Sequence, residues 1–270
     1  MRISSVNKIE FLAMFEHALK DAVGDDAFTI DEGMRYATLD GGKRVRPMCV
    51  YLGARAVGDA DADEIVRLAV GVELVHNYSL VHDDLPAMDN DDYRRGKLSV
   101  HKKFGHANGI LIGDQLLTLA SCKLLDGARV YGTRFARAAQ EITFAAKEMV
   151  RGQAVDLAGC QSEEDYLDMY SQKTAALIRG ALKAGAICAG ATFEQIEKME
   201  EFGELTGVCF QLADDLLDEG EENSIVSLIG EEAVKDLLAK RTEKACQIAR
   251  ENFNADELCE FANALAKREK

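Results

Sequence analysis

Proline and tryptophan are almost missing from this sequence. Its 270 residues include two prolines, Pro47 and Pro86, no tryptophan and only 7% aromatic residues. No stretch is rich in glycine and serine, so the sequence offers no flexible linker between domains. Hydrophobic residues make up 47% of the chain, which is enough to bury one large core. We therefore expect a single domain over residues 1–270, with a mainly aliphatic core.

Basic residues are also few. Lys and Arg number 32 against 47 Asp and Glu, which gives a net charge of −15, and no basic arm or stripe is present. Because nucleic-acid-binding proteins need clustered cations to neutralise phosphates, we expect no nucleic-acid partner. A small anionic substrate stays possible where local cations or metal ions offset the acidic residues.

Paired cysteines and long apolar runs are missing as well. The seven cysteines are widely spaced and form no C-x-x-C motif, a pattern typical of reduced thiols rather than of disulfides or a zinc site. The best candidate membrane segment, residues 175–191, is broken by Arg179 and Lys183 and is too short to span a bilayer. Residues 1–22 contain three acids and lack the apolar core of a signal peptide. We expect a cytoplasmic protein without a membrane span.

Helical periodicity dominates what is present. Apolar residues recur at three- and four-residue steps in residues 64–84, as at Ile65, Leu68 and Val72. The same pattern occurs in five further segments, residues 110–125, 136–150, 177–189, 194–217 and 231–249. No segment alternates convincingly with period two. We therefore predict an all-α bundle of antiparallel helices.

The first group of residues with chemical interest is an aspartate-rich segment. Five aspartates lie within residues 83–92, directly after an apolar helical pattern. Pro86 disfavours helical geometry at the residue before it, so the aspartates should gather where the helix ends. Carboxylates that repel one another suit Mg²⁺, which prefers hard oxygen ligands. A solvated acidic loop is the alternative for an isolated cluster.

A second aspartate cluster lies in residues 210–218. Asp214 and Asp218 are one helical turn apart and so share a face of an otherwise apolar helix. A surface-charge explanation is weak in that setting. Two such clusters on separate helices could hold metal ions between them.

A basic segment, residues 41–47, is the third group. Lys43, Arg44 and Arg46 follow two glycines in an otherwise acidic protein, which indicates a compact receptor for an anion. The segment is not a P-loop, because the first glycine of that motif and its Ser or Thr are missing. Two aspartate clusters that hold metal ions could bind one diphosphate. Together with Arg94 and Arg95, the basic segment therefore predicts a second diphosphate site.

Taken in order, these motifs resemble those of the polyprenyl synthetase family, and most closely its bacterial farnesyl diphosphate synthases. The matching motifs are Gly-Gly-Lys-Arg-x-Arg-Pro at residues 41–47, Asp-Asp-x4-Asp at 83–89, Arg-Arg-Gly at 94–96, Gly113-Asp114, Lys173-Thr174 and Phe-Gln-x-x-Asp-Asp-x-x-Asp at 210–218. They span roughly residues 36–218. Several spaced motifs in one order are far more specific than a single short match.

The resemblance implies an isoprenoid synthase fold, in which helices surround a deep central cavity and the two aspartate-rich motifs face each other at its mouth. It also implies a homodimer. The implied reaction is an Mg²⁺-dependent condensation of isopentenyl diphosphate with an allylic diphosphate, either dimethylallyl or geranyl.

The resemblance also implies roles for particular residues. Three Mg²⁺ ions in each active site would be bound by Asp83, Asp84, Asp89, Asp214 and Asp218. Arg94 and Lys173 would contact the allylic diphosphate. Isopentenyl diphosphate would be held by Lys43, Arg46, His76 and Arg95. Thr174 and Gln211 would direct oxygen dipoles at the allylic cation, so that they act with Lys173 in catalysis.

Tyr78 is expected to limit the length of the product. It lies five residues before Asp83, about 7.5 Å away along one helix. In the family that the chain resembles, a bulky aromatic residue here closes the cavity floor and stops elongation at fifteen carbons. We therefore expect farnesyl diphosphate, with geranylgeranyl diphosphate as the other candidate and an ordinary core tyrosine as the other role.

The sequence departs from the family pattern after Asp218. A Gly/Lys-rich loop is expected there, but residues 219–230 are shorter, lack lysine and contain three glutamates. An inactive or regulatory paralogue with the same fold therefore stays open. A terpene cyclase is the other alternative, although it has no second diphosphate for Lys43 and Arg46 to bind. A di-iron bundle needs a second Glu-x-x-His motif beside that of residues 73–76, and the sequence has none.

Overall fold

The computed structural model describes residues 1–39, 41–217 and 224–267, and these are almost entirely helical. The prediction of an all-α bundle is confirmed. In chain order, the elements are the 3₁₀ helix η1 (Ile3–Ser5), α1 (Lys8–Val23), α2 (Thr29–Thr38), α3 (Val45–Val57), α4 (Ala62–Asp83), β1 (Tyr93–Arg94), β2 (Lys97–Leu98), α5 (Val100–Phe104), α6 (His106–Tyr131), α7 (Thr133–Ala158), α8 (Glu163–Tyr170), the π-helical turn η2 (Ser171–Ala175), α9 (Ala176–Cys188), α10 (Phe193–Leu217), α11 (Ile225–Ile229), α12 (Glu231–Asn252) and α13 (Ala255–Ala266).

Each periodic segment of the sequence forms one helix, and several helices extend beyond their apolar pattern. Helices α6 and α7 are separated only by Gly132, whose φ of 81° is unfavourable for other residues. The chain therefore reverses there without a longer loop. The short antiparallel pair β1–β2 was not predicted, because two residues in each strand are too few to show an alternating pattern.

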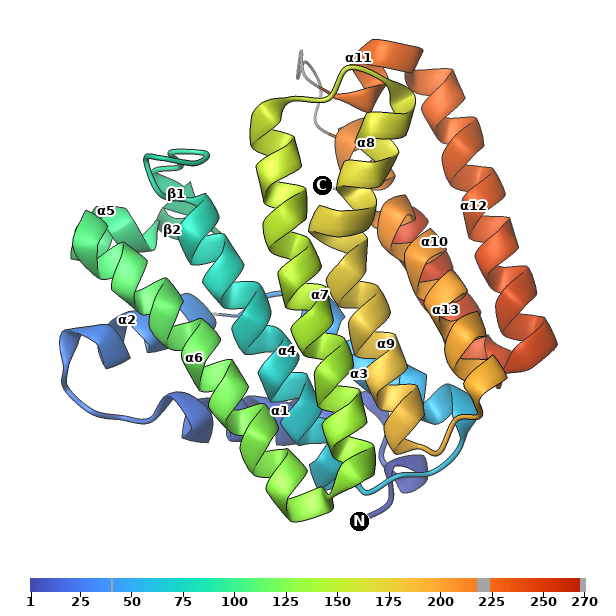
Figure 1. Cartoon of the computed structure of the whole chain (residues 1–270), viewed down its shortest axis with the longest axis horizontal. Helices are drawn as coiled ribbons and strands as arrows, with labels where there is room; N and C mark the ends of the chain where they lie inside the picture. Colours follow the sequence, from blue (N-terminus) through green and yellow to red (C-terminus); the bar gives the residue numbers. More distant parts are fainter. Residues whose placement is uncertain (40, 218–223, 268–270) are drawn as a thin grey trace.

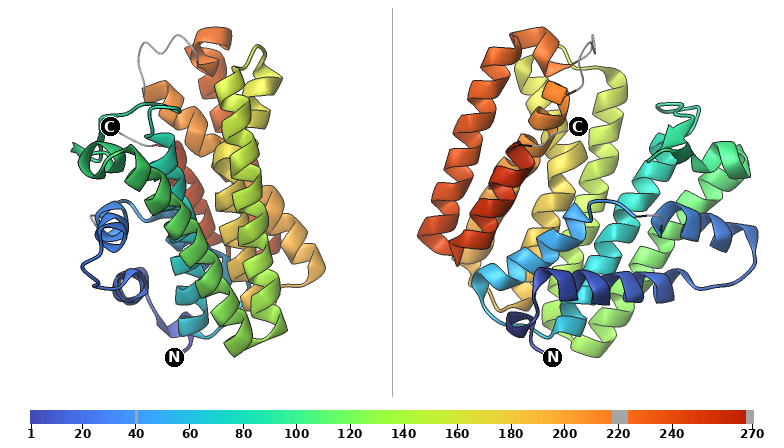
Figure 2. Two further views of the ribbon diagram at one scale, coloured as in Figure 1. Left: turned by 60° about the vertical axis from the view of Figure 1, so that its left-hand side comes forward. Right: turned by 180° about the vertical axis from the view of Figure 1, so that it is seen from behind.

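Most of the helices form one packed layer, and a second, smaller group of helices packs against one face of that layer. Figure 1 shows α6, α4, α7 and α9 side by side, with α10, α12 and α13 continuing beyond α9. Helices α1, α2 and α3 lie behind this layer and come to the front in the right-hand view of Figure 2. A large aliphatic cluster fills the space between the groups and includes Ile65, Leu68, Ile112 and Leu182, all fully buried.

Several helices end at the same end of the bundle. The C-terminal ends of α4, α7 and α10 lie there in Figure 1, together with β1–β2 and the turn η2. Helix α4 ends at Asp83, three residues before Pro86, as the proline predicted. Helix C-termini have a partial negative charge that favours cations. This end of the bundle is therefore suited to cationic ligands.

No helix in the described ranges of the chain combines the length and the apolar character needed to cross a membrane. The seven cysteines all lie in those ranges and are free thiols.

Candidate active site

A cavity of about 960 Å³ opens at the end of the bundle where α4, α7 and α10 terminate. Most of the residues that the sequence singled out line it. They are Lys43, Arg46, His76, Tyr78, Asp83, Asp89, Arg94, Arg95, Lys173, Thr174, Gln211 and Asp214. The predicted deep cavity is therefore present, with both aspartate-rich motifs and the basic segment on its wall. Asp84 does not belong to this set, and Asp218 lies outside the described residues.

One side of the cavity is acidic with a single lysine among the acids. The ammonium group of Lys173 forms an ion pair with Asp156, near the end of α7. Burial raises the pKa of Asp83 to about 6, Lys173 opposes that shift, and the charge of Asp89 adds to it. Burial likewise raises the pKa of Asp89, again against Lys173. The acids at this wall therefore repel one another, and a further cation among them is electrostatically favoured.

This donor set fits Mg²⁺ in its chemistry. Asp83, Asp89 and Asp214 all present hard carboxylate oxygens to the cavity. In the part of the chain that the structure describes, no three acidic, His or Cys side chains lie close enough together to hold a metal ion by themselves. Mg²⁺ commonly takes only one or two carboxylates plus substrate phosphates. A site completed by a diphosphate is therefore consistent with this arrangement. Asp218 and the acidic loop that follows it lie outside the described residues.

Asp84 does not face the cavity with its neighbour Asp83. It is 2% exposed, and its Oδ1 accepts a hydrogen bond from Nε of Arg94 at 2.9 Å. Nη2 of Arg94 donates to the same oxygen and to Asp91. Asp84 therefore holds the guanidinium of Arg94, which itself lines the cavity. Its predicted role as a metal ligand stays a prediction.

A chain of hydrogen bonds connects the catalytic candidates on α10 and η2. Oγ1 of Thr174 donates to Oε1 of Gln211 at 3.0 Å, and Nε2 of Gln211 donates to Oδ1 of Asp215 at 3.0 Å. The hydroxyl of Tyr170 donates to the other oxygen of Asp215. Because the Thr174 hydroxyl hydrogen is used in this chain, the lone pairs of its oxygen stay available to the cavity.

Lys173 and Thr174 lie in the turn η2, which is π-helical. Turns of this kind are rare and often occur at functional sites. One extra residue in the turn changes which side chains face the cavity. Neither this turn nor the contribution of Tyr170 and Asp215 was predicted, although the sequence did show Asp215 beside Asp214.

A second group of residues that line the cavity is cationic. Nη1 of Arg46 lies 3.2 Å from Nε2 of His76, and Nη1 of Arg95 donates to the carbonyl oxygen of Gly41 at 2.9 Å. Burial, followed by the charges of Arg46 and Arg95, holds the pKa of His76 well below its usual range. His76 is therefore a neutral group within a cationic cluster, and Lys43 completes that cluster.

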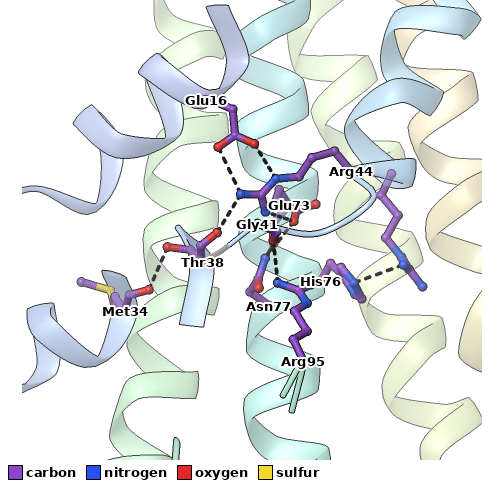
Figure 3. Close-up of polar contacts among 10 residues, drawn as sticks. Glu16, Met34, Thr38, Gly41, Arg44, Glu73, His76, Asn77 and Arg95 are labelled. Atoms are coloured by element: carbon purple, nitrogen blue, oxygen red, sulfur yellow. Dashed lines mark hydrogen bonds and ion pairs between the residues drawn. The ribbon is translucent and has the colours of Figure 1, made fainter. Parts of the chain in front are cut away.

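Arg44 differs from its neighbours in the basic segment. The sequence grouped it with Lys43 and Arg46, but its side chain is 4% exposed and pairs with Glu16 and Glu73. No pattern in the sequence indicated these partners, which lie on α1 and α4. Figure 3 shows the Arg44 guanidinium between the two carboxylates.

The family model described as polyprenyl synthetase matches residues 28–268 of this chain. The chain belongs to the polyprenyl synthetase family. It is 39% identical over 224 residues to geranylgeranyl pyrophosphate synthase 11 of Arabidopsis thaliana, which covers 79% of this chain and 62% of the relative. It is also 39% identical over 211 residues to farnesyl diphosphate synthase of Geobacillus stearothermophilus, which covers 74% of this chain and 70% of that protein. Several plant relatives are matched over less than two thirds of their own length.

Solved structures of the family extend the likeness to nearly the whole chain. An FPP/GFPP synthase from Zymomonas mobilis superposes with a TM-score of 0.88 at 31% identity, covering 95% of this chain and 96% of that one. The isoprenoid synthase fold expected from the motifs is therefore confirmed.

An aromatic pair, Tyr78 and His82, also lines the cavity. Tyr78 is 6% exposed and lies edge-to-face against His82, with ring centroids 5.9 Å apart. Nε2 of His82 contacts the carbonyl oxygen of Ile110 at 3.0 Å. A Cβ atom at Gly113 would lie 2.1 Å from that ring nitrogen, so Gly113 leaves space for His82. The sequence assigned His82 no role, because a lone histidine gives no positional signal.

Proposed function

We propose that this protein is an Mg²⁺-dependent prenyltransferase that joins an allylic diphosphate to isopentenyl diphosphate. The observation that supports this most directly is the presence of two different anion-binding walls in one cavity. Lys43, Arg46 and Arg95 form a cationic wall, whose neighbouring carboxylate Glu73 is paired with Arg44. Asp83, Asp89 and Lys173 form a wall suited to an anion bound through metal ions. Two diphosphates that need different partners match this division.

Each of the two walls would bind the diphosphate of one substrate. Mg²⁺ supplies positive charge against the negative charge that develops on the departing allylic diphosphate, and Asp83, Asp89 and Asp214 are the groups that would hold it. Three ions per site is the number that the family resemblance implies. Lys173 and Arg94 add fixed positive charge on the same side. The diphosphate of the second substrate stays bound to Lys43, Arg46 and Arg95.

Thr174 and Gln211 face the carbocation formed when the allylic C–O bond breaks. The lone pairs of Thr174 Oγ1 and the amide dipole of Gln211 stabilise positive charge without forming a bond to it. The double bond of isopentenyl diphosphate then attacks the cation, and the new cation loses a proton. Apolar wall residues such as Met149 and Phe210 help to exclude water, which would otherwise capture the cation.

We propose farnesyl diphosphate as the main product, since Tyr78 lines the cavity and the family resemblance implies that a bulky residue here ends the growth of the chain. The relatives do not decide this point, because some are named geranylgeranyl and others farnesyl diphosphate synthases. The one-domain organisation and the cytoplasmic location also stay proposals, and the seven free thiols support a reducing compartment.

A homodimer is supported by an exposed apolar surface on α6 and α7. Leu125 is 71% exposed, Val130 57% and Phe144 51%, and the two helices pack side by side (Figure 1). Large exposed apolar side chains on neighbouring helices are groups that an interface would cover. A second copy of the chain is the occupant that we propose.

Incubation with isopentenyl diphosphate, Mg²⁺ and each allylic diphosphate in turn, followed by chain-length analysis of the products, tests the proposal. A prenyltransferase forms longer diphosphates and releases pyrophosphate. A terpene cyclase consumes an allylic diphosphate without isopentenyl diphosphate, and an inactive paralogue consumes neither.

Asp83→Ala should reduce turnover at least a hundredfold while the circular dichroism spectrum of the helices stays unchanged. Near-normal turnover in this variant would contradict the metal assignment.

A further inference from the structure

Arg44 lies between two proposed substrate ligands in the sequence, yet its guanidinium is bound by protein groups. Its Nε donates to Oε1 of Glu16 at 2.7 Å and its Nη2 to Oε2 of Glu16 at 3.1 Å. Its Nη1 donates to Oε1 of Glu73 at 2.7 Å. The first two bonds form the two-pronged pair that only arginine can make with a carboxylate (Figure 3).

A fourth hydrogen bond leaves Arg44 little capacity for a ligand. Its Nη2 also donates to the carbonyl oxygen of Thr38 at 2.9 Å. A guanidinium has five N–H groups, and four of those in Arg44 therefore point at protein acceptors. The contacts tie the basic segment to α1 through Glu16, to the end of α2 through Thr38, and to α4 through Glu73. Arg44 is thus a structural connection and not a phosphate ligand.

The backbone of Arg44 is also unusual. Its φ of 46° and ψ of 36° lie in the left-handed region, which residues other than glycine seldom adopt. It immediately precedes α3, which begins at Val45. The chain turns sharply at this residue. Arg44 borders the cavity beside Lys43 and Arg46, but its guanidinium is held by Glu16 and Glu73. The four side-chain hydrogen bonds hold the backbone in this otherwise unfavourable conformation.

The acceptor Glu73 is next to the substrate wall itself. It precedes His76 by three residues, so both lie on one face of α4. His76 is the residue that Arg46 contacts. Nδ2 of Asn77 donates to the same Glu73 oxygen that Arg44 uses, which fixes that carboxylate on the helix. The position of Arg44 is therefore coupled to the face of α4 against which Arg46 packs.

We propose that Arg44 is the positioning residue of the isopentenyl diphosphate subsite. Through Glu16 and Glu73, it sets the spacing of Lys43 and Arg46 and so controls affinity for this substrate. The proposed ligands of the allylic diphosphate and its metal ions, Asp83, Asp89, Lys173 and Asp214, are not among the partners of the Arg44 guanidinium. This inference rests on the proposed function, because it names which of two substrates depends on Arg44.

The test compares Michaelis constants for the two substrates in Arg44→Lys. Lysine keeps the charge but cannot make the forked pair with Glu16 while also reaching Glu73 and Thr38. We expect KM for isopentenyl diphosphate to rise on the order of tenfold, equivalent to the loss of one such interaction. KM for the allylic diphosphate should change less than about twofold. Glu16→Gln, at a 43% exposed side chain, should reproduce the direction of the effect if Arg44→Lys does not fold.

Arg55→Lys provides the matched control. Arg55 lies on the same helix α3, pairs with Glu257 through Nε at 3.3 Å and donates to the carbonyl oxygen of Ser4 at 2.9 Å, but it does not line the cavity. Its substitution should leave both Michaelis constants unchanged. The double variant Arg44→Lys with Glu16→Gln should raise KM for isopentenyl diphosphate by less than the product of the single effects, because both remove one connection.

The possible outcomes separate this inference from the proposed function. Equal changes in both Michaelis constants, or a lower melting temperature with unchanged constants, would show that Arg44 only stabilises the fold. Absence of turnover in the wild type would refute the proposed function instead. In that case, calorimetric titration with inorganic pyrophosphate in EDTA measures how tightly the cationic wall binds an anion without metal ions. Weaker binding to Arg44→Lys than to Arg55→Lys then supports the positioning role, and equal binding overturns it.

Discussion

Tyr78 is the side chain that we propose sets the size of the product. Its residue lines the cavity, and its ring packs edge-to-face on His82. Tyr78→Ala removes the ring and should extend the space available to the growing chain. We expect products of twenty carbons or more to replace most of the fifteen-carbon product.

Radiolabelled isopentenyl diphosphate and chromatography of the hydrolysed products provide the measurement. His17→Ala on the exposed face of α1 serves as a control for handling and stability. An unchanged distribution of chain lengths in Tyr78→Ala would show that another residue closes the cavity.

His76 should make stability depend on pH. Burial and the neighbouring cations Arg46 and Arg95 lower its pKa in the folded protein, whereas the unfolded chain binds a proton at the ordinary value of about 6.5. Below that value the unfolded state therefore holds more protons. Its contribution to stability is complete above about pH 6.5 and is lost as pH falls towards the folded pKa, by up to about 1.4 kcal/mol per pH unit.

Denaturant unfolding of wild type and His76→Gln between pH 5 and pH 8 measures this contribution. The difference between the two proteins should have a slope of about 1.4 kcal/mol per unit below pH 6.5 and no slope above it. His17→Gln is the matched surface substitution. Parallel curves for wild type and His76→Gln over the whole range would mean that His76 does not resist protonation.

At the scale of elements, two glycines determine how closely α3 and α9 approach. A Cβ atom at Gly185 would lie 2.0 Å from the carbonyl oxygen of Val50, and one at Gly53 would lie 2.0 Å from that of Leu182. Backbone atoms cannot move aside as a side chain can. This close crossing places the start of α3, and with it Arg46, against the helices that surround the cavity.

Gly185→Ala should therefore destabilise the fold by about 1–3 kcal/mol, although alanine favours a helix by about 1 kcal/mol over glycine. Gly71→Ala is the matched control, since the three atoms nearest to its new Cβ all belong to the Leu124 side chain and none to the backbone. Denaturant midpoints of the two variants provide the comparison. A Gly185→Ala midpoint at or above that of Gly71→Ala would contradict this account of the crossing.

Ion pairs across α9 add a second constraint at this scale. Lys183 pairs with Glu141 on α7 and Glu200 on α10. Arg179, one turn earlier, pairs with Glu148 and Glu204 on the same two helices. Each cation on α9 therefore connects both neighbours, in a region where α9 is otherwise apolar and buried. These pairs fix the rotation of α9 and so the direction in which Lys173 and Thr174 point.

For the whole molecule, the apolar surface on α6 and α7 predicts association. Leu125→Glu places a charge at the 71% exposed position on α6 and should convert a dimer to a monomer, because burying an unpaired carboxylate is costly. Light scattering after size-exclusion chromatography measures the mass. Ile9→Glu, at an 81% exposed position on α1, is the control and should leave the mass unchanged. A wild-type monomer would contradict the proposed homodimer.

The sequence by itself determined the helices and most of the chemical groups of the site. Apolar spacing fixes a helix locally, because residues three and four apart always share a face. Pro86 fixed the end of α4 for an equally local reason. The motifs, and the family resemblance that they support, then identified twelve residues that line one cavity, from Lys43 to Asp214.

Only the tertiary structure decided which way neighbouring side chains point. Asp83 faces the cavity while Asp84 turns to Arg94, and Lys43 faces it while Arg44 turns to Glu16 and Glu73. These partners lie 28 and 29 residues from Arg44 in the chain, beyond any local pattern. The direction in which a side chain points at the end of a helix depends on such distant contacts. The regular helical geometry that relates sequence position to side-chain direction stops there.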